Sequence, residues 1–194
     1  PKPGVQQPVA ETGPIRFATS GHAQMDAWRD DFAARAMAAG HDRALVKSLL
    51  EGIRPLPLWL GTEVQAATAP SSQAEFAKPI WDYLKVPMGQ TRISSGQTKL
   101  AALGPTLAAI EAKYGVDRQV LLAIWGMETS YGGFMGTDDA ANALANMAVE
   151  GRRRAFAEAE IFALMEIVEK GYARRDQLGS GWAGAMGHTQ FMPT

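Results

Sequence analysis

The sequence predicts an all-α protein, and three observations support this fold class. Apolar residues recur with helical spacing in several long segments that are bounded by capping residues, glycine or proline. No segment shows a convincing strand-like alternation of apolar and polar residues, and no internal repeat is visible. The length of 194 residues, with 46% hydrophobic and 20% charged residues, is typical of one globular domain.

The first twenty residues, 1–20, predict a flexible leader. They contain prolines at positions 1, 3, 8 and 14 and few large apolar side chains. We therefore expect one helical domain over residues 21–194.

Two helices are expected at the start of this domain. The first follows Gly21 and ends at Gly40, and its apolar face consists of Met25, Trp28, Phe32 and Ala36. The second is capped by Asp42 and stopped by the prolines at 55 and 57, and its apolar face consists of Leu45, Leu49 and Ile53. Residues 58–72 then predict an extended surface segment.

The middle of the chain predicts a short or kinked helix over residues 73–84, with Tyr83 near its end. Residues 94–114 predict one longer helix that begins at Ser94 or Ser95. Gly104-Pro105 should bend this helix, and Gly115 should end it.

The most informative helix is expected over about residues 118–130. Asp117 can cap its first turn, and Gly132-Gly133 offers a left-handed stop. Leu121, Trp125 and Glu128 fall at positions i, i+4 and i+7. This spacing predicts that Glu128 shares an apolar, partly buried stripe with two large side chains.

Glu128 is therefore the candidate general acid. Partial burial and the negative end of the helix dipole both favour the protonated form of a carboxyl group. A carboxylic acid that stays protonated near neutral pH can donate a proton to a leaving group. The alternative is a helix-end glutamate whose carboxylate points into water, and this segment alone leaves both interpretations open.

Two more helices are expected after a glycine-containing loop. An Ala-rich helix should cover residues 139–149, and a longer one should cover residues 152–170 and end at Gly171. Asp138 and Asp139 are better explained as capping and first-turn acids than as catalytic groups, because nothing in their spacing directs them toward Glu128.

The closing segment, residues 179–194, is the second informative region. Its glycines at 179, 181, 184 and 187 allow the backbone to approach a ligand closely, and Ser180, His188 and Gln190 supply donors and acceptors. A tight glycine-rich turn without a ligand is the alternative. Trp182 and Met186 could form an apolar floor beneath a sugar ring.

Composition excludes several classes of function. The net charge is −1 and no long basic run occurs, so no nucleic-acid partner is expected. The absence of cysteine excludes disulfides and thiol chemistry, and His188 has no acid or cysteine partner at metal-ligand spacing. No metal or cofactor is therefore assigned. No apolar run is long enough to cross a bilayer, and no signal peptide begins the sequence, so an exported protein would be present here in mature or trimmed form.

Three segments together resemble the lytic murein transglycosylase B family. They are Ile124-Trp-Gly-Met-Glu-Thr-Ser-Tyr-Gly132, the cluster Arg152-Arg-Arg154 leading into Glu160-Ile161, and Trp182-Ala-Gly-Ala-Met-Gly-His-Thr-Gln-Phe-Met-Pro193. The resemblance extends more loosely over about residues 26–194. It implies a lysozyme-like helical fold, glycan strands of bacterial peptidoglycan with their peptide stems as partners, and a periplasmic location, with an outer-membrane anchor left open.

The resemblance also implies roles for individual residues. Glu128 matches the catalytic glutamate of the family. Gln190 and Tyr83 match pocket residues, and Tyr131 and Met186 lie within the two motifs and are expected to bind substrate. The paired arginines that meet the peptide stem match Arg152 and Arg153, or Arg153 and Arg154. Ser180 matches a sugar-binding serine, although Gly181 is inserted between it and Trp182.

The expected reaction uses Glu128 as a single acid and base. It protonates the glycosidic oxygen and then takes a proton from O6 of N-acetylmuramic acid, so that the product is the 1,6-anhydro sugar. Hydrolysis by water, as in lysozymes, and a glycan-binding module without turnover are the alternatives. Family members continue well past Met-Pro, so we also expect a domain that is truncated at its C-terminal side and completed by further polypeptide in cis or as a separate chain.

Overall fold

A computed structural model describes residues 13–60, 79–85 and 87–194. These residues are mostly helical, which confirms the all-α prediction. The helices are α1 (Ala23–Ala38), α2 (Arg43–Leu50), α3 (Pro57–Leu60), α5 (Ile80–Leu84), α6 (Gln90–Ala102), α7 (Gly104–Tyr114), α8 (Arg118–Thr129), α9 (Ala140–Glu150), α10 (Arg154–Glu169) and the 3-10 helix η2 (Arg175–Gln177). Two short strands, β1 (Asp138–Asp139) and β2 (Gly179–Ser180), pair antiparallel.

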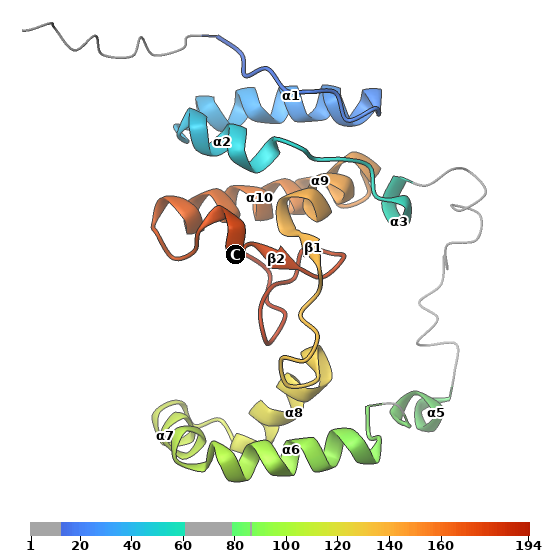
Figure 1. Cartoon of the computed structure of the whole chain (residues 1–194), viewed down its shortest axis with the longest axis vertical. Coiled ribbons are helices and arrows are strands. Elements are labelled where there is room, and N and C mark those ends of the chain that lie inside the picture. The colour runs from blue at the N-terminus through green and yellow to red at the C-terminus, as the bar shows by residue number, and fades with distance from the viewer. Residues whose placement is uncertain (1–12, 61–78, 86) are drawn as a thin grey trace, which may run out of the picture.

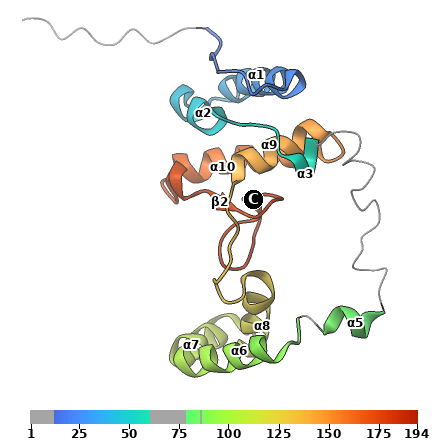
Figure 2. The same cartoon turned by 45° about the vertical axis from the view of Figure 1, so that its right-hand side comes forward.

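The helices form two groups that lie at opposite ends of the molecule (Figure 1). In one group α1 packs on α9, and α2 packs on both α9 and α10. In the other group α6 packs on α7 and α8. Figure 2 shows the same separation from a second direction, with the closing segment lying between the two groups. The loop that leads from α8 to β1 and this closing segment therefore connect the two groups.

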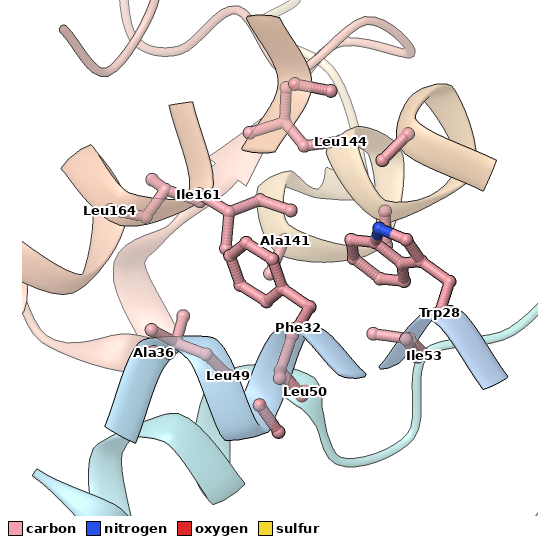
Figure 3. Close-up of a cluster of buried hydrophobic side chains, with 14 of the residues drawn as sticks. Trp28, Phe32, Ala36, Leu49, Leu50, Ile53, Ala141, Leu144, Ile161 and Leu164 are labelled. Carbon is pink, nitrogen blue, oxygen red and sulfur yellow. The ribbon is translucent and has the colours of Figure 1, made fainter. Parts of the chain in front are cut away.

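The main hydrophobic core surrounds α9. Every residue from 140 to 149 is buried, and the small alanine side chains let neighbouring helices approach closely. The predicted apolar face of α1 is confirmed, because Met25, Trp28, Phe32 and Ala36 are all buried. Figure 3 shows this core, which includes Trp28, Phe32, Ala36, Leu49, Leu50, Ile53, Ala141, Leu144, Ile161 and Leu164.

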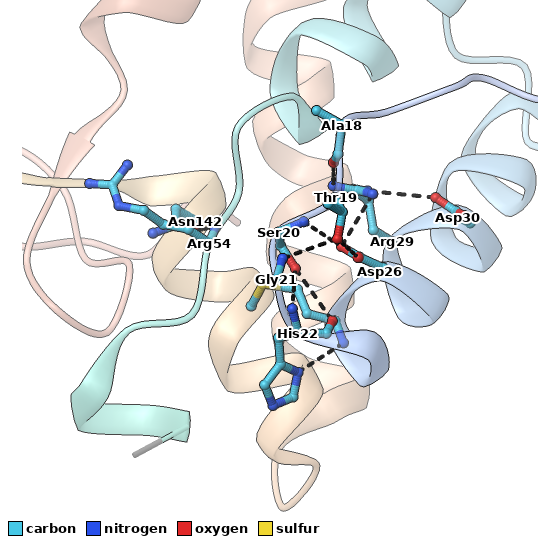
Figure 4. A network of polar contacts seen from close by, with 11 residues as sticks. Ala18, Thr19, Ser20, Gly21, His22, Asp26, Arg29, Asp30, Arg54 and Asn142 are labelled. Atoms are coloured by element: carbon cyan, nitrogen blue, oxygen red, sulfur yellow. Dashed lines mark hydrogen bonds and ion pairs between the residues drawn. The ribbon is translucent and has the colours of Figure 1, made fainter. Parts of the chain in front are cut away.

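Part of the predicted leader belongs to this group of helices. Ile15 is buried in the core, and the carbonyl of Ala18 accepts a hydrogen bond from the buried Arg29 at 2.9 Å. Asp26 accepts further hydrogen bonds from the Thr19 hydroxyl and the Ser20 N–H (Figure 4). The boundary predicted after residue 20 is therefore wrong for residues 13–20, because one apolar side chain and a polar network fix them to α1. Residues 1–12 lie outside the described part of the chain.

Where the structure describes them, most of the other predicted helices are confirmed, with corrected bounds. Asp42 and Asp117 cap α2 and α8, as their positions predict. The helix expected over residues 94–114 is two helices that meet at Leu103, and the first begins at Gln90. Ser94 lies inside α6, where its hydroxyl donates to the carbonyl of Gln90 at 2.7 Å instead of capping the helix.

The segment expected to be extended, residues 58–72, begins with the last turn of α3. The rest of it, together with most of the segment 73–84, lies outside the described residues. Within the described ranges, no helix has both the length and the apolar character needed to cross a membrane.

Candidate functional site

Glu128 lies in the last turn of α8, but not on its buried face. The buried residues of this helix are Leu122, Gly126 and Thr129, one position along from the predicted stripe. Leu121 and Trp125 are only half-buried, and Glu128 is exposed. The expectation that Glu128 lies on a partly buried stripe is therefore wrong, because α8 packs on α6 and α7 through the adjacent face.

The end of α8 differs from the prediction in a way that shapes the site. The left-handed residue that stops the helix is Ser130 (φ 51°), and Tyr131 follows with φ 62° before Gly132 at 82°. Left-handed backbone is costly for residues other than glycine, so surrounding contacts must hold this turn. Thr129 provides two of them, because its carbonyl accepts from the Phe134 N–H at 3.0 Å and its hydroxyl oxygen accepts from the Gly132 N–H at 3.0 Å.

Thr129 also ties the closing segment to α8. Its buried hydroxyl donates to the carbonyl of His188 at 2.7 Å. One helical turn earlier, the indole N–H of Trp125 donates to His188 Nδ1 at 3.0 Å. These two hydrogen bonds join the two motifs at His188, and one of them comes from the residue that follows Glu128.

Tyr131 supports this turn from the other side. Its hydroxyl donates to the carbonyl of Arg92 in α6 at 3.0 Å, and its ring packs edge-on against Trp125. A Cβ atom at Gly126 would lie 2.6 Å from the Tyr131 hydroxyl. The glycine of the Trp-Gly-Met-Glu motif thus makes room for a tyrosine that braces α8 against α6, and the substrate contact expected of Tyr131 stays a prediction.

Glu128 and Gln190 open onto the same pocket, which we call the acid pocket. It has a volume of about 220 Å³, and its lining consists of Glu128, Phe134, Gly136, Thr137, Asp138, Gly181, Trp182 and Gln190. The aromatic side chains of Phe134 and Trp182 are exposed beside the acid. Exposed aromatic faces next to a carboxyl and an amide are suited to a sugar ring, which presents both apolar C–H groups and hydroxyls.

Gln190 is held in a fixed orientation within the acid pocket. Its backbone is left-handed (φ 51°), and its side-chain Nε2 donates to the carbonyls of Gly187 at 2.9 Å and Met135 at 3.3 Å. A Cβ atom at Gly181 would lie 3.0 Å from Gln190 Oε1. The inserted glycine therefore leaves room for the amide oxygen of Gln190.

Ser180 lies behind the wall of the acid pocket. It is fully buried in β2, and its hydroxyl donates to the carbonyl of Gly181 at 2.9 Å. The close approach of Gly136 to the Ser180 carbonyl leaves no space for a side chain at position 136. In this arrangement Ser180 supports the wall, and its role as a sugar ligand stays a prediction.

The three arginines are not among the residues that line the acid pocket. Arg152 forms an ion pair with Glu150, and the Arg153 guanidinium lies 4.2 Å from the centre of the Phe156 ring. Arg154 Nε donates to the carbonyl of Ala148 at 3.1 Å. All three are exposed at the connection between α9 and α10.

Tyr83 and Met186 complete the set of predicted residues. The backbone of Tyr83 lies in α5, whereas its side chain is outside what the structure describes. Met186 bridges β2 and Phe191 through backbone pairing, and its side chain lines a separate, mainly apolar cavity of about 410 Å³. Met186 is not among the residues that line the acid pocket.

Asp138 is the site residue that the sequence interpretation missed. Asp139 does cap α9, because its Oδ1 accepts from the Asn142 N–H at 2.9 Å. Asp138, however, lines the acid pocket together with Glu128. The antiparallel pairing of Asp138 with Ser180 brings the two motif regions together, and sequence spacing carries no signal for this pairing. Among the described residues, no group of three or more acidic or histidine side chains is arranged to hold a metal ion.

Comparison with known proteins assigns the family. The transglycosylase SLT domain matches residues 24–194. No curated protein sequence matches the chain.

Solved structures extend this comparison. SltB3 from Pseudomonas aeruginosa in complex with NAG-NAM-pentapeptide is 35% identical with a TM-score of 0.77, and the match covers 89% of this chain and 44% of that one. The same protein with NAG-anhNAM-pentapeptide is 37% identical with a TM-score of 0.76 and the same coverage. Slt35 from Escherichia coli in complex with bulgecin A is 20% identical with a TM-score of 0.72, over 93% of this chain and 55% of that one, and shows the fold alone. The chain spans less than half the length of SltB3. It belongs to the transglycosylase SLT domain family and has the lysozyme-like fold of lytic transglycosylases, as its motifs predict.

Proposed function

We propose that the protein is a peptidoglycan lytic transglycosylase that cleaves the β-1,4 bond between N-acetylmuramic acid and N-acetylglucosamine. The observation that carries the proposal is the acid pocket, where Glu128 from the first motif meets Gln190 from the second. The likeness to SltB3, which was solved with NAG-NAM-pentapeptide and with NAG-anhNAM-pentapeptide, supports this substrate class. Because bacterial peptidoglycan lies outside the cytoplasmic membrane, the proposed place of action is the periplasm.

In the proposed mechanism Glu128 acts twice. Its carboxyl group donates a proton to the glycosidic oxygen as the bond from C1 to that oxygen breaks. The resulting carboxylate then accepts the proton of the O6 hydroxyl of N-acetylmuramic acid as O6 bonds to C1. The proton thus returns to Glu128, no water is consumed, and the product is the 1,6-anhydro sugar.

Glu128 is exposed in the free protein, so water surrounds its carboxyl group until substrate binds. A sugar placed between Phe134 and Trp182 would displace water from the carboxyl group of Glu128 and hold the glycosidic oxygen beside it. We also propose that additional polypeptide, in cis or as a separate chain, covers the open side of the acid pocket in the active state. The exposed side chains of Phe134 and Trp182, which line this pocket, support this proposal.

Hydrolysis by water is the second candidate function, and one observation favours it. Asp138 lines the acid pocket with Glu128. Paired carboxyl groups on either side of a glycosidic bond are the usual arrangement of glycoside hydrolases. In this case Asp138 would activate the attacking water, or form a covalent bond to C1 that water then hydrolyses, and the product would carry a reducing end.

Mass analysis of the fragments released from purified peptidoglycan tests the proposed function. We expect anhydro fragments, each lighter by one water molecule than the corresponding reducing fragment. Glu128→Gln should keep the fold and lower the rate by about 10²–10⁴-fold, because the amide cannot donate the proton. Asp138→Asn is the matched comparison, since it should keep anhydro product formation. Reducing fragments that disappear in Asp138→Asn would instead establish the hydrolase.

A further inference from the structure

A second, polar pocket adjoins the acid pocket. It has a volume of about 250 Å³ and shares Thr137 and Asp138 with the acid pocket as a common wall. Its other polar lining includes Glu51, Arg54 and Asn142. None of these three residues belongs to either of the motifs that form the acid pocket.

Asn142 supplies a buried donor to this polar pocket. The residue is only 6% exposed, and its Oδ1 accepts from the Arg54 N–H at 2.8 Å. This hydrogen bond fixes the orientation of the amide, so Nδ2 is the free end. Nδ2 has no hydrogen-bond partner in the described structure, and it is not among the atoms closed off from solvent, so it is available from the pocket that the residue lines. An amide donor that has no protein partner and faces the pocket can donate to a ligand bound there.

The position of Arg54 is fixed by α9. Asn146 Nδ2 donates to the carbonyl of Arg54 at 2.9 Å, and Asn146 Oδ1 accepts from the Leu56 N–H at 2.8 Å. Together with Asn142, this clamp holds the backbone that carries the Arg54 guanidinium at the pocket. Figure 4 shows Arg54 extending away from the network around Asp26, with Asn142 beside it.

Charges of both signs line the polar pocket without neutralising one another. The guanidinium of Arg54 makes no ion pair or hydrogen bond with the described residues, and neither do the carboxylates of Glu51 and Asp138. In contrast, Arg175 pairs with Asp139 in the same lining. A ligand that carries both an ammonium and a carboxylate group can satisfy the separated charges, whereas a simple anion would face two carboxylates.

We propose that this polar pocket binds a zwitterionic α-amino acid group. Its carboxylate would accept from Arg54 and Asn142 Nδ2, and its ammonium would donate to Asp138 or Glu51. A peptide terminus carries only one of these two charges, so within a peptide the group would be the unlinked end of a diamino dicarboxylic acid residue. Because Asp138 and Thr137 also line the acid pocket, this peptide would be one carried by the glycan, an assignment that rests on the proposed function. The amino acid itself is recognised independently of the glycan.

The test uses alanine, N-acetylalanine and alaninamide as probes of the 194-residue chain, followed by NMR. Alanine should shift the side-chain amide signals of Asn142 saturably. Removal of either charge, in N-acetylalanine or in alaninamide, should weaken binding by about tenfold, the loss of one charge-assisted hydrogen bond. Arg54→Gln removes the partner of the carboxylate, so this variant should bind alanine and alaninamide equally. The double variant Asp138→Asn, Glu51→Gln removes the partners of the ammonium group, so it should bind alanine and N-acetylalanine equally.

Lys113→Gln on α7 is the matched control, because it also removes a cation and should bind alanine as the wild type does. Arg54 is exposed and its backbone makes the clamp contacts, so Arg54→Gln should keep the spectrum of the folded protein. Unsaturable shifts, or equal alanine binding by Arg54→Gln and the wild type, would overturn the inference. Alanine binding without peptidoglycan cleavage would refute only the proposed function, and cleavage without alanine binding would refute only this inference.

Discussion

At the scale of single residues, the glycines and the left-handed turn determine how Glu128 is presented. Gly126 lies two residues before the acid, in contact with Tyr131, which in turn donates to α6. Ser130 and Tyr131 adopt positive φ angles that are rare for such residues. The strain is concentrated next to the candidate acid, which is typical of functional sites.

Gly126→Ala should therefore disturb the site more than a helix-favouring substitution normally would. The new methyl group would overlap the Tyr131 ring, and overpacking of this kind costs about 1–3 kcal/mol of unfolding free energy. Gly104→Ala in α7 is the control, because a Cβ atom there meets nothing within 4 Å. The melting temperature and the rate of peptidoglycan cleavage should both decrease for Gly126→Ala and stay unchanged for Gly104→Ala. An unchanged melting temperature would mean that Tyr131 moves aside without cost.

At the scale of elements, local signals predicted more than contacts between distant segments did. The capping aspartates and the periodic apolar face of α1 follow from neighbours within one or two turns, so α1, α2 and α8 begin where expected. The pair β1–β2 has only two residues in each strand, which is too short for a recognisable alternation. Likewise, the exposure of Glu128 depends on which face of α8 packs on α6. Since α8 has apolar residues on several sides, its sequence alone did not determine which face would be buried.

The start of α1 leads to a prediction about acid stability. Hydrogen bonds from Ser20 and then Thr19 lower the pKa of Asp26 from 3.8 to about 2. Since the pKa is lower in the folded state, this stabilisation is complete above the unfolded value and is lost as the pH falls from about 4 to 2. Asp26→Asn should lower the unfolding free energy at pH 7 by about 1–2 kcal/mol, the range of hydrogen bonds to a charged group at a partly exposed site.

Urea unfolding at several pH values measures this contribution. The wild type should lose its advantage over Asp26→Asn between pH 4 and pH 2, where the carboxylate of Asp26 becomes protonated. Asp31→Asn, which removes an exposed partner of Arg35, is the control. Its unfolding free energy should stay close to that of the wild type at every pH. A constant difference between the wild type and Asp26→Asn down to pH 2 would contradict the assigned network.

At the scale of the whole molecule, the last part of the closing segment, residues 188–194, is held at both ends. Thr129 in α8 donates to the His188 carbonyl, and the buried Glu160 in α10 accepts from the N–H and hydroxyl of Thr194 at 3.0 and 2.9 Å. Gln190 lies between these two attachments. The two helix groups thus position Gln190 jointly. Because these contacts come from segments distant in the sequence, local periodicity could not predict that Gln190 lies near Glu128, whereas the family resemblance could.

Thr129→Val should release one end of this segment while the fold is retained. Valine preserves the size of the buried side chain but cannot donate to His188, so the unfolding free energy should fall by about 1–3 kcal/mol. Cleavage of peptidoglycan should fall as well, because the backbone two residues before Gln190 loses its hydrogen bond to α8. Thr98→Val, which removes an exposed hydroxyl that donates within α6, is the matched control and should change neither quantity.

Glu160→Gln tests the other end, because an amide offers one acceptor where the carboxylate offers two. If both attachments position Gln190, Thr129→Val and Glu160→Gln should each lose more in cleavage, expressed as activation free energy, than in unfolding free energy. The double variant should then lose less cleavage activity than the sum of the two single losses. Coupling of this kind is expected for residues that act on one shared element. Full cleavage activity in both single variants would mean that the loop from α8 to β1 suffices to bring Gln190 to Glu128.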